Sequence, residues 1–345
     1  MEPCWSAQSR TLESGRSVPP GKIPLSLPSC WLSSSCDHMA SWGAGLRARG
    51  SEVDYVLHVM VLVAIYTILS VSLNLISGYT GLLSVAHAAL FGVGSYVAAL
   101  LALHFDAGLL LGLVCAAAGA ALISLFVAAP SLRIRDDYFV LATFAFQVIA
   151  FSVMNNWVGV TGGPMGLPGI PQPSVFGIDI ASHAQFLLLT GTFAAFALLL
   201  VRRLVRAPYG RVLKALREDE VFAQSMGKSI TSYKLQVFVI GAALAAVAGT
   251  LYAHYITFID PTSFTVQESI FMLAIVIVGG SGSIAGSVVG AALLVALPEA
   301  LRFLGLPSSV AANVRQILYG ALLVACMMFR PQGILGEFAF RRKQA

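Results

Sequence analysis

Five polar side chains lie close together in a stretch that is otherwise apolar. Asn74, Tyr79, Thr80, Ser84 and His87 can all donate or accept hydrogen bonds, and Ser84 and His87 are one helical turn apart. In a membrane protein such groups either hold helices together or line the route of a polar solute. For His87 we expect a packing hydrogen bond, and we keep the lining of a translocation pathway by all five side chains as a hypothesis.

The sequence lacks the motifs of the common catalytic and nucleotide-binding sites. Val276–Gly286 has the outline of a dinucleotide fingerprint, but the alternating strands and helices that such a site needs are missing. No P-loop, metalloprotease or serine-hydrolase motif occurs. We therefore expect no catalytic residue, no metal site and no cofactor. If ATP drives this protein, another chain must hydrolyse it.

Carboxylates are rare in the apolar segments. Glu268 falls near the outer start of one segment, and Glu299 stands three residues before Arg302, the spacing of an ion pair on a helix. Carriers driven by protons or sodium use buried carboxylates as relays. The small number here argues against such a carrier.

The composition is that of an integral membrane protein. Of the 345 residues, 57% are hydrophobic and 11% are charged, which leaves too little polar surface for a water-soluble protein. Apolar runs of about 20 residues, the length of a membrane-crossing helix, recur along the chain. The predicted fold class is an all-α polytopic membrane protein.

We predict about nine to ten transmembrane helices. Nine apolar segments are candidates, namely 55–76, 80–104, 108–129, 137–156, 184–205, 235–258, 266–280, 284–304 and 314–330. Gly, Ser, Thr, Tyr and His interrupt residues 77–92, so this part is expected to be a broken or re-entrant helix. Counting residues 77–104 as two pieces gives ten, and would place the basic N-terminal tail in the cytoplasm.

Small residues recur every four positions in two of these segments. Gly282, Gly286 and Gly290 form one such row, and Gly241, Ala245 and Gly249 form another. Residues four apart share a helix face, and small ones let a second helix approach closely. Both rows are predicted to be helix-packing faces.

The basic residues predict the orientation in the membrane. Residues 202–234, Arg133–Arg135 and the tail from Arg330 together hold fourteen of the 21 Lys and Arg residues. Since basic loops stay in the cytoplasm, these three regions are predicted to lie inside. The uncharged segment Asn155–Gln185 is then outside.

The charge is concentrated in the cytoplasmic stretch Gly210–Lys234. No Pro or Gly interrupts Arg211–Met226, and Gly227 follows where a helix commonly ends. Leu213, Leu216, Ala223 and Met226 have near-helical spacing. The pattern predicts one short amphipathic helix that either docks a partner or serves only as a solvated basic loop.

Long stretches of the chain resemble the branched-chain amino acid importer permeases of the LivM type, which belong to the ATP-binding-cassette (ABC) transporters. They include "SLNLISGYTGLLSVAHAALFGVGSYVAALL" (72–101), "NNWVGVTGGPMGLPGIP" (155–171), "GRVLKALREDEVFAQSMGKSITSYKLQVFVIGAALAAVAGTLYAHY" (210–255) and "VIVGGSGSIAGSVVGAALL" (276–294). "SLRIRDDYFVLATFAF" (131–146) and "FRPQGILG" (329–336) also match. The resemblance spans residues 55–336 in order.

The resemblance implies a multi-pass permease of the bacterial inner membrane with several partners. These are a related second permease, two cytoplasmic ATP-binding subunits and a periplasmic amino-acid-binding protein, while nucleic acid is not expected. The charged stretch would be the coupling helix that docks into the ATPase, and its contact residues would be Arg217, Glu218, Asp219, Glu220, Ala223 and Gly227. The binding protein would dock near Thr161, Gly162, Gly163 and Pro164.

The predicted function is therefore import of leucine, isoleucine and valine from periplasm to cytoplasm, energised by separate ATPase subunits. A urea or short-amide importer permease shares the architecture and is the alternative. An ion-coupled secondary amino acid carrier is a third reading, less favoured because paired intramembrane carboxylates are missing.

Three regions are predicted along the chain. Residues 1–52, rich in Ser, Pro, Gly and Arg, are expected to be a disordered extension or to precede the true start. Residues 53–337 form the permease transmembrane domain, with the coupling loop at 206–234. Residues 338–345 form a basic cytoplasmic tail.

Overall fold

A computed structural model describes residues 53–132, 136–175, 178–180, 182–302, 308–330 and 332–336. Nearly all of them belong to one compact unit, Asp54–Ala345. The predictions for residues 1–52, Arg133–Arg135 and the tail 338–345 lie outside the described residues, as do the side chains of the predicted Glu299–Arg302 pair.

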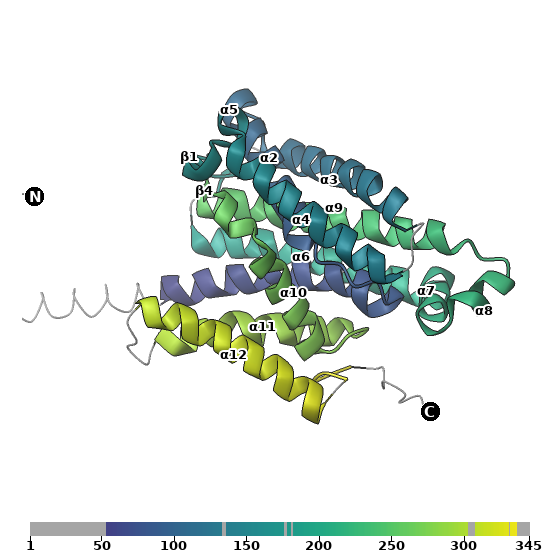
Figure 1. The fold of residues 1–345 in the computed structure, drawn as a ribbon. Coiled ribbons are helices and arrows are strands. Elements are labelled where there is room, and N and C mark those ends of the chain that lie inside the picture. Colours follow the sequence, from purple (N-terminus) through teal and green to yellow (C-terminus); the bar gives the residue numbers. More distant parts are fainter. Residues whose placement is uncertain are drawn as a thin grey trace, which may run out of the picture. The chain divides into compact units, whose positions relative to one another are not determined.

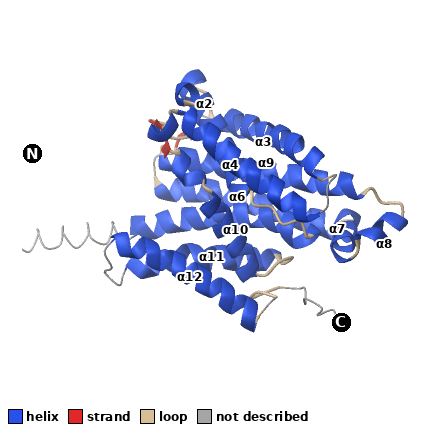
Figure 2. Cartoon of the chain, in the orientation of Figure 1, coloured by secondary structure: helices blue, strands red, loops and turns tan. Residues whose placement is uncertain are grey.

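The described chain is mostly helical, as Figure 2 shows. The first helix, Val53–Gly78, ends in a π-helical turn at Asn74–Gly78. The α-helices that follow are α2 (His87–Phe105), α3 (Leu109–Ser131), α4 (Asp136–Asn156), α5 (Val158–Thr161), α6 (His183–Arg206), α7 (Pro208–Glu218), α8 (Glu220–Ser225), α9 (Ile230–Ile256), α10 (Val266–Gly279), α11 (Ile284–Arg302) and α12 (Ser308–Phe329). Short 3-10 turns occupy Gly163–Met165 and Pro261–Phe264.

Six of the described helices are long and apolar enough to cross a membrane. They are the first helix, α2, α3, α6, α9 and the Tyr138–Asn156 part of α4. Three further apolar helical stretches lie within α10, α11 and α12, at Val266–Gly279, Ile284–Pro298 and Gln316–Cys326. Every predicted apolar segment thus contains a helix, and the all-α class is confirmed for the described part. The count of nine to ten spans is not confirmed, since six of the described helices meet the length and composition of a span.

The interruption predicted within residues 77–92 is narrower in the structure. Helical backbone continues to Thr80, residues 81–86 are not helical, and α2 begins at His87. Gly81 has a positive φ of 77°, a left-handed conformation that glycine adopts without strain. The break therefore separates the first helix from α2.

Close backbone contacts join α2 to α9, as the small-residue row on α9 predicts. Ser95 Oγ in α2 donates to the Gly249 carbonyl at 3.0 Å, and a Cβ added at Gly249 would lie 2.3 Å from the Phe91 oxygen. Gly94 approaches Ala246 as closely, since its added Cβ would lie 2.4 Å from the Ala246 Cα. Small residues thus bring these two helices into backbone contact. Both helices have buried stretches of Ala and Leu around these contacts.

The second small-residue row is confirmed in part. Gly286 and Gly290 on α11 face α10, where an added Cβ at either would overlap the backbone near Gly279. Gly282 precedes α11 and lies in the α10–α11 turn with a φ of 81°. Its assignment to a packing face was wrong, because the α10–α11 connection needs a left-handed residue there.

The described strands are four two-residue pieces. β1 (Leu167–Pro168) pairs antiparallel with β4 (Phe258–Ile259), and β2 (Ser174–Val175) pairs with β3 (Ile178–Asp179). Leu167 lies opposite Ile259 in the first pair. This pairing ties the loop after α5 to the end of α9. Figure 1 shows β1, β4 and α5 at one end of the helical bundle, with α7 and α8 at the other.

Candidate functional site

The charged stretch forms two helices instead of the one that was predicted. α7 starts at Pro208, which suits the first turn of a helix, and ends at Glu218. Asp219 is extended, with φ −154° and ψ 108°, and its Oδ1 accepts a hydrogen bond from the Phe222 amide at 3.0 Å. Asp219 therefore caps α8. The prediction of an unbroken helix over Arg211–Met226 is wrong, because an Asp side chain competes for amide donors and favours a helix start.

Gly227 ends α8 as predicted. Its φ is 76°, and its amide donates to the Gln224 carbonyl at 2.9 Å. The next amide, of Lys228, donates to the Ala223 carbonyl at 3.3 Å. These two bonds form a Schellman motif, in which a left-handed glycine satisfies the last carbonyls of a helix. We call Pro208–Gly227 the α7–α8 hairpin.

The apolar face predicted from the near-helical spacing is buried at three of its four residues. Leu213, Leu216 and Ala223 are buried, whereas Met226 is 66% exposed. The break at Asp219 changes the direction of the chain, so that the helical periodicity counted across it no longer applies. Met226 consequently lies on the solvent side of the hairpin.

The Arg217 side chain points into the protein. Its guanidinium donates a hydrogen bond to the Gly78 carbonyl, at the end of the first helix, and lies 3.5 Å from the Ser281 Oγ in the α10–α11 turn. The side chain also passes over Gly81, whose added Cβ would lie 3.2 Å from Arg217 Cγ. Burial lowers the pKa of Arg217 from its ordinary value, and the neighbouring Glu218 opposes this shift. Arg217 thus joins the hairpin to the helix break.

Glu220 is also engaged within the chain. Its carboxylate forms an ion pair with Lys234 in the first turns of α9. The Lys234 side chain is 4% exposed and that of Glu220 is 35% exposed. The pair therefore fixes α8 against α9 at the edge of the bundle.

The rest of the hairpin presents an exposed surface that is partly apolar. Glu218 and Asp219 are exposed, and so are Val221 at 77% and Phe222 at 60%. We call Glu218, Asp219, Val221, Phe222 and Met226 the hairpin face. Val221 and Phe222 were missed in the sequence, although two large apolar residues inside a charged segment are a signal that could have identified them.

Asn74 holds the α10–α11 turn from the first helix. Its Nδ2 donates to the Ser283 carbonyl at 2.9 Å and lies 2.7 Å from the Ser287 Oγ, while its Oδ1 accepts from the Gly282 amide at 2.8 Å. The side chain is buried at 1% exposure. Both ends of this amide are therefore used in joining two distant segments.

The other four polar residues of this group are buried as well. Tyr79, Thr80, Ser84 and His87 are at most 3% exposed. His87 Nε2 lies 2.8 Å from the Ser72 Oγ on the first helix, whereas within the described residues its Nδ1 has no hydrogen-bond partner. The packing hydrogen bond expected for His87 is present. A lining role for the five residues stays a prediction.

Thr161–Pro164 form a folded loop at the end opposite the hairpin. Thr161 Oγ1 donates to the Met154 carbonyl at 2.7 Å and is buried. Gly162 and Gly163 both have positive φ, which turns the chain so that Pro164 and Met165 are exposed. The structure shows a shaped, exposed loop, and its docking role stays a prediction.

The comparisons with known proteins agree on one family. Residues 55–327 match the family described as the permease component of the branched-chain amino acid transport system. The LivM permease protein of Salmonella typhimurium is 36% identical over 316 residues, which cover 84% of this chain and 70% of the relative. LivM of Escherichia coli is 35% identical, covering 80% and 69%. LivH of Escherichia coli is 28% identical over 292 residues, covering 79% and 91%.

The family match covers nearly all of the described structure, from the first helix into α12. Six helices of membrane-spanning length and the similarity to permeases together establish a multi-pass membrane protein. The chain belongs to the branched-chain amino acid transport permease family.

Proposed function

We propose that this chain is the membrane-spanning permease subunit of an ABC importer. It would carry leucine, isoleucine and valine from the periplasm to the cytoplasm across the bacterial inner membrane. The observation that carries the proposal, beside the family match, is the α7–α8 hairpin. It exposes acidic and apolar groups outward while Arg217 joins it to the protein interior.

The hairpin face is proposed to dock onto a separate ATPase subunit. Phe222 and Val221 offer apolar area, and Glu218 and Asp219 offer charge at its edge. Large exposed apolar groups beside charges are typical of protein interfaces. Of the contact residues predicted from the sequence, Ala223 and Gly227 would shape the hairpin. Arg217 and Glu220 would hold it against the bundle, since their described contacts are internal.

The proposed assembly lies in the lipid bilayer and has three kinds of protein partner. A second, related permease is supported by the similarity of this chain to both LivM and LivH. Two ATPase subunits and a periplasmic binding protein follow from the family, and the binding protein would dock at Thr161–Pro164. Helices α10, α11 and α12 would complete nine spans, or ten with residues 77–104 counted as two pieces.

Branched-chain amino acids are proposed as substrates because the relatives are named for them. The urea and short-amide alternative receives no support from these names. A secondary carrier would transport without ATPase subunits, which gives a direct experimental distinction. In the proposed importer, the substrate pathway would be bordered by the five buried polar residues, which would also keep the adjoining helices in place. These are Asn74, Tyr79, Thr80, Ser84 and His87.

The test is uptake of labelled leucine by proteoliposomes that contain this chain, a partner permease, the ATPase subunits and the binding protein. We expect uptake to require ATP and every subunit. Phe222→Ala should lower both the ATPase bound to the purified permease and the leucine uptake. The matched control is Phe105→Ala. Phe105 is 77% exposed and is the last residue of α2, far from the hairpin face in the sequence and in the fold.

Two results would contradict the proposal. Uptake that continues without ATPase subunits would indicate a secondary carrier. Equal loss of bound ATPase in the Phe222 and Phe105 variants would show that the hairpin face is not the docking site.

A further inference from the structure

The turn between α10 and α11, Gly280–Ser283, is contacted by three segments that are far apart in the sequence. Ser281 lies beside the Arg217 guanidinium of the hairpin. The Asn74 side chain of the first helix bonds to the last two residues of the turn. The third segment, residues 332–336, follows α12 and meets the first residue of the turn. We call residues 332–336 the clasp.

Backbone hydrogen bonds hold the clasp against the end of α10. The Ile334 amide donates to the Val278 carbonyl at 2.9 Å, and the Leu335 amide donates to the Gly279 carbonyl at 3.0 Å. Both carbonyls belong to the last turn of α10, where a helix has no internal donors left for them. The end of α10 is therefore completed by the segment that follows α12.

Glycine is required where the clasp meets the turn. Gly333 is buried and has a φ of 78°, and a Cβ added to it would lie 2.4 Å from the Gly280 Cα. Gly280 has a φ of 118°, and its added Cβ would lie 2.4 Å from the Gly336 amide nitrogen. The left-handed backbone and the lack of space both disfavour a side chain at these two positions. The clasp and the turn are therefore in direct backbone contact.

The side chains of the clasp contribute less to this contact than its backbone does. Ile334 is 42% exposed, Leu335 is 46% exposed and Gln332 is also exposed. The amides of Ile334 and Leu335 nevertheless reach α10. Consequently α12 cannot move away from the end of α10 without the loss of these two hydrogen bonds.

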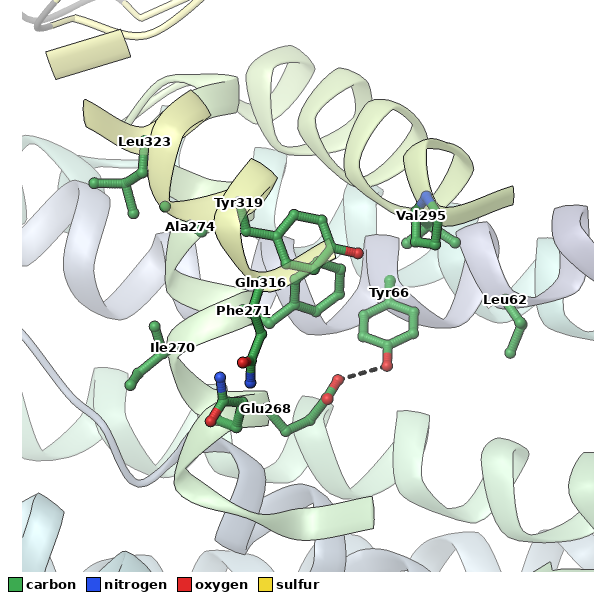
Figure 3. Close-up of a pocket in the computed structure, with 13 residues that line it drawn as sticks. Leu62, Tyr66, Glu268, Ile270, Phe271, Ala274, Val295, Gln316, Tyr319 and Leu323 are labelled. Carbon is green, nitrogen blue, oxygen red and sulfur yellow. Dashed lines mark hydrogen bonds between the residues drawn. The ribbon is translucent and has the colours of Figure 1, made fainter. Parts of the chain in front are cut away.

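Farther from the turn, the first helix, α10, α11 and α12 enclose a cavity of about 500 Å³. Figure 3 shows Tyr66 of the first helix, Val295 of α11 and Leu323 of α12 at its border. Tyr66 lies about 18 Å along the first helix from Gly78, at about 1.5 Å per residue. Close packing transmits a displacement, whereas a cavity leaves room for one. The four helices are thus joined tightly at the turn and have room to shift at the cavity.

We propose that the clasp is a coupling element of the transport cycle, with Gly333 and Gly280 as its positioning residues. When the hairpin moves with its ATPase, Arg217 displaces the α10–α11 turn, and the clasp makes α12 follow α10. The three helices α10, α11 and α12 then turn as one body against the first helix, about the Asn74 contact, and the cavity changes in volume. This inference rests on the proposed function and names the elements that carry the movement into the membrane.

The experiment measures the leucine imported per ATP hydrolysed by the complete importer in proteoliposomes. Gly333→Ala should keep the ATPase subunits bound and active, because the hairpin face is unchanged. It should lower the leucine-to-ATP ratio about fivefold or more, the range of coupling between distant sites. Gly94→Ala is the matched control, since it also places a Cβ 2.4 Å from a backbone atom, but at the α2–α9 contact. Its leucine-to-ATP ratio should equal that of the wild-type chain.

Two variants of Ile334 test the clasp without crowding it. Ile334→Pro removes the amide that bonds to the Val278 carbonyl, whereas Ile334→Ala keeps the amide and removes the exposed side chain. We expect Ile334→Pro to lower the leucine-to-ATP ratio as Gly333→Ala does, and Ile334→Ala to leave it unchanged. Arg217→Ala combined with Gly333→Ala should lower the ratio no more than either change alone, because both interrupt the same connection.

The outcomes distinguish failure of the clasp from failure of the proposed function. If the wild-type chain shows ATP-driven uptake, an unchanged ratio in both Gly333→Ala and Ile334→Pro would overturn the coupling role alone. Equal loss in Ile334→Ala and Ile334→Pro would also overturn it, since the side chain would then be responsible. So would a ratio in Gly94→Ala as low as that in Gly333→Ala. Absence of ATP-driven uptake by the wild-type chain would overturn the proposed function and the coupling role with it.

Discussion

The Arg217 guanidinium donates a hydrogen bond to the carbonyl oxygen of Gly78, and this contact joins α7 to the end of the first helix. The same guanidinium lies beside Ser281 in the α10–α11 turn. One side chain of the hairpin thus reaches two of the segments that surround the helix break at 81–86. A movement of the hairpin would shift both segments together.

Replacing Arg217 should separate ATP hydrolysis from transport. In Arg217→Ala the hairpin face is intact, so we expect ATPase to remain bound to the purified permease. Leucine uptake should fall about tenfold or more, because the charge-assisted hydrogen bond is lost. Uptake and ATPase activity measured on the same proteoliposomes check this. The control is Arg211→Ala, which removes an exposed charge from the same helix and should leave uptake and ATPase activity unchanged. Loss of bound ATPase in Arg217→Ala would indicate that Arg217 contacts the ATPase directly.

The Glu220–Lys234 ion pair should stabilise the position of α8. Glu220→Gln removes the carboxylate from a nearly buried lysine, which should lower the free energy of unfolding by about 2 kcal/mol, less than for a fully buried pair because Glu220 is partly exposed. Adding Lys234→Met should restore most of this loss. Thermal unfolding in detergent measures both. The control is Glu218→Gln, at an exposed carboxylate, which should leave the unfolding temperature unchanged and weaken only ATPase binding. If the double variant Glu220→Gln/Lys234→Met is as unstable as Glu220→Gln alone, the idea of a stabilising pair is refuted.

Asn74 should be a stability determinant. Asn74→Ala leaves the Gly282 amide and the Ser283 carbonyl without this partner in a buried region, so a loss of about 3 kcal/mol is expected. Asn156→Ala removes an exposed amide that bonds to the Ser152 carbonyl, and should change stability by less than about 0.5 kcal/mol. Thermal unfolding of both variants tests whether Asn74→Ala loses more stability than Asn156→Ala. Equal unfolding temperatures would indicate that water or lipid replaces the Asn74 contacts.

The α2–α9 contact should not tolerate one extra methyl group. Gly94→Ala places a Cβ within 2.4 Å of the Ala246 Cα, which forces the helices apart at a cost of about 1–3 kcal/mol. Gly191 on α6 has no atom within 4 Å of its added Cβ. Gly191→Ala should therefore stabilise the helix by about 0.5–1 kcal/mol. Unfolding temperatures that move in the same direction would contradict this assignment of the packing face.

Much of the fold could be predicted from local pattern. Each of the nine apolar segments contains a helix, because burying about 20 apolar residues in a bilayer requires the backbone to bond within the segment. The Gly227 helix end was likewise predicted, since the left-handed backbone it needs is a property of glycine itself. The break at Asp219 was missed. An aspartate can continue a helix or cap the next one, and its neighbours in the sequence do not distinguish the two.

The sequence by itself determined the membrane class, the family and the segment that carries the charge, because hydropathy, residue type and spacing are local properties. The tertiary structure alone decided that Arg217 and Glu220 turn inward while Val221 and Phe222 remain exposed. It also decided that Glu268 lies beside Tyr66, 202 positions away, in a cavity formed by four helices. The physical reason is that which face of a helix is buried, and which distant groups meet, depends on the packing of helices whose own sequences are compatible with several arrangements.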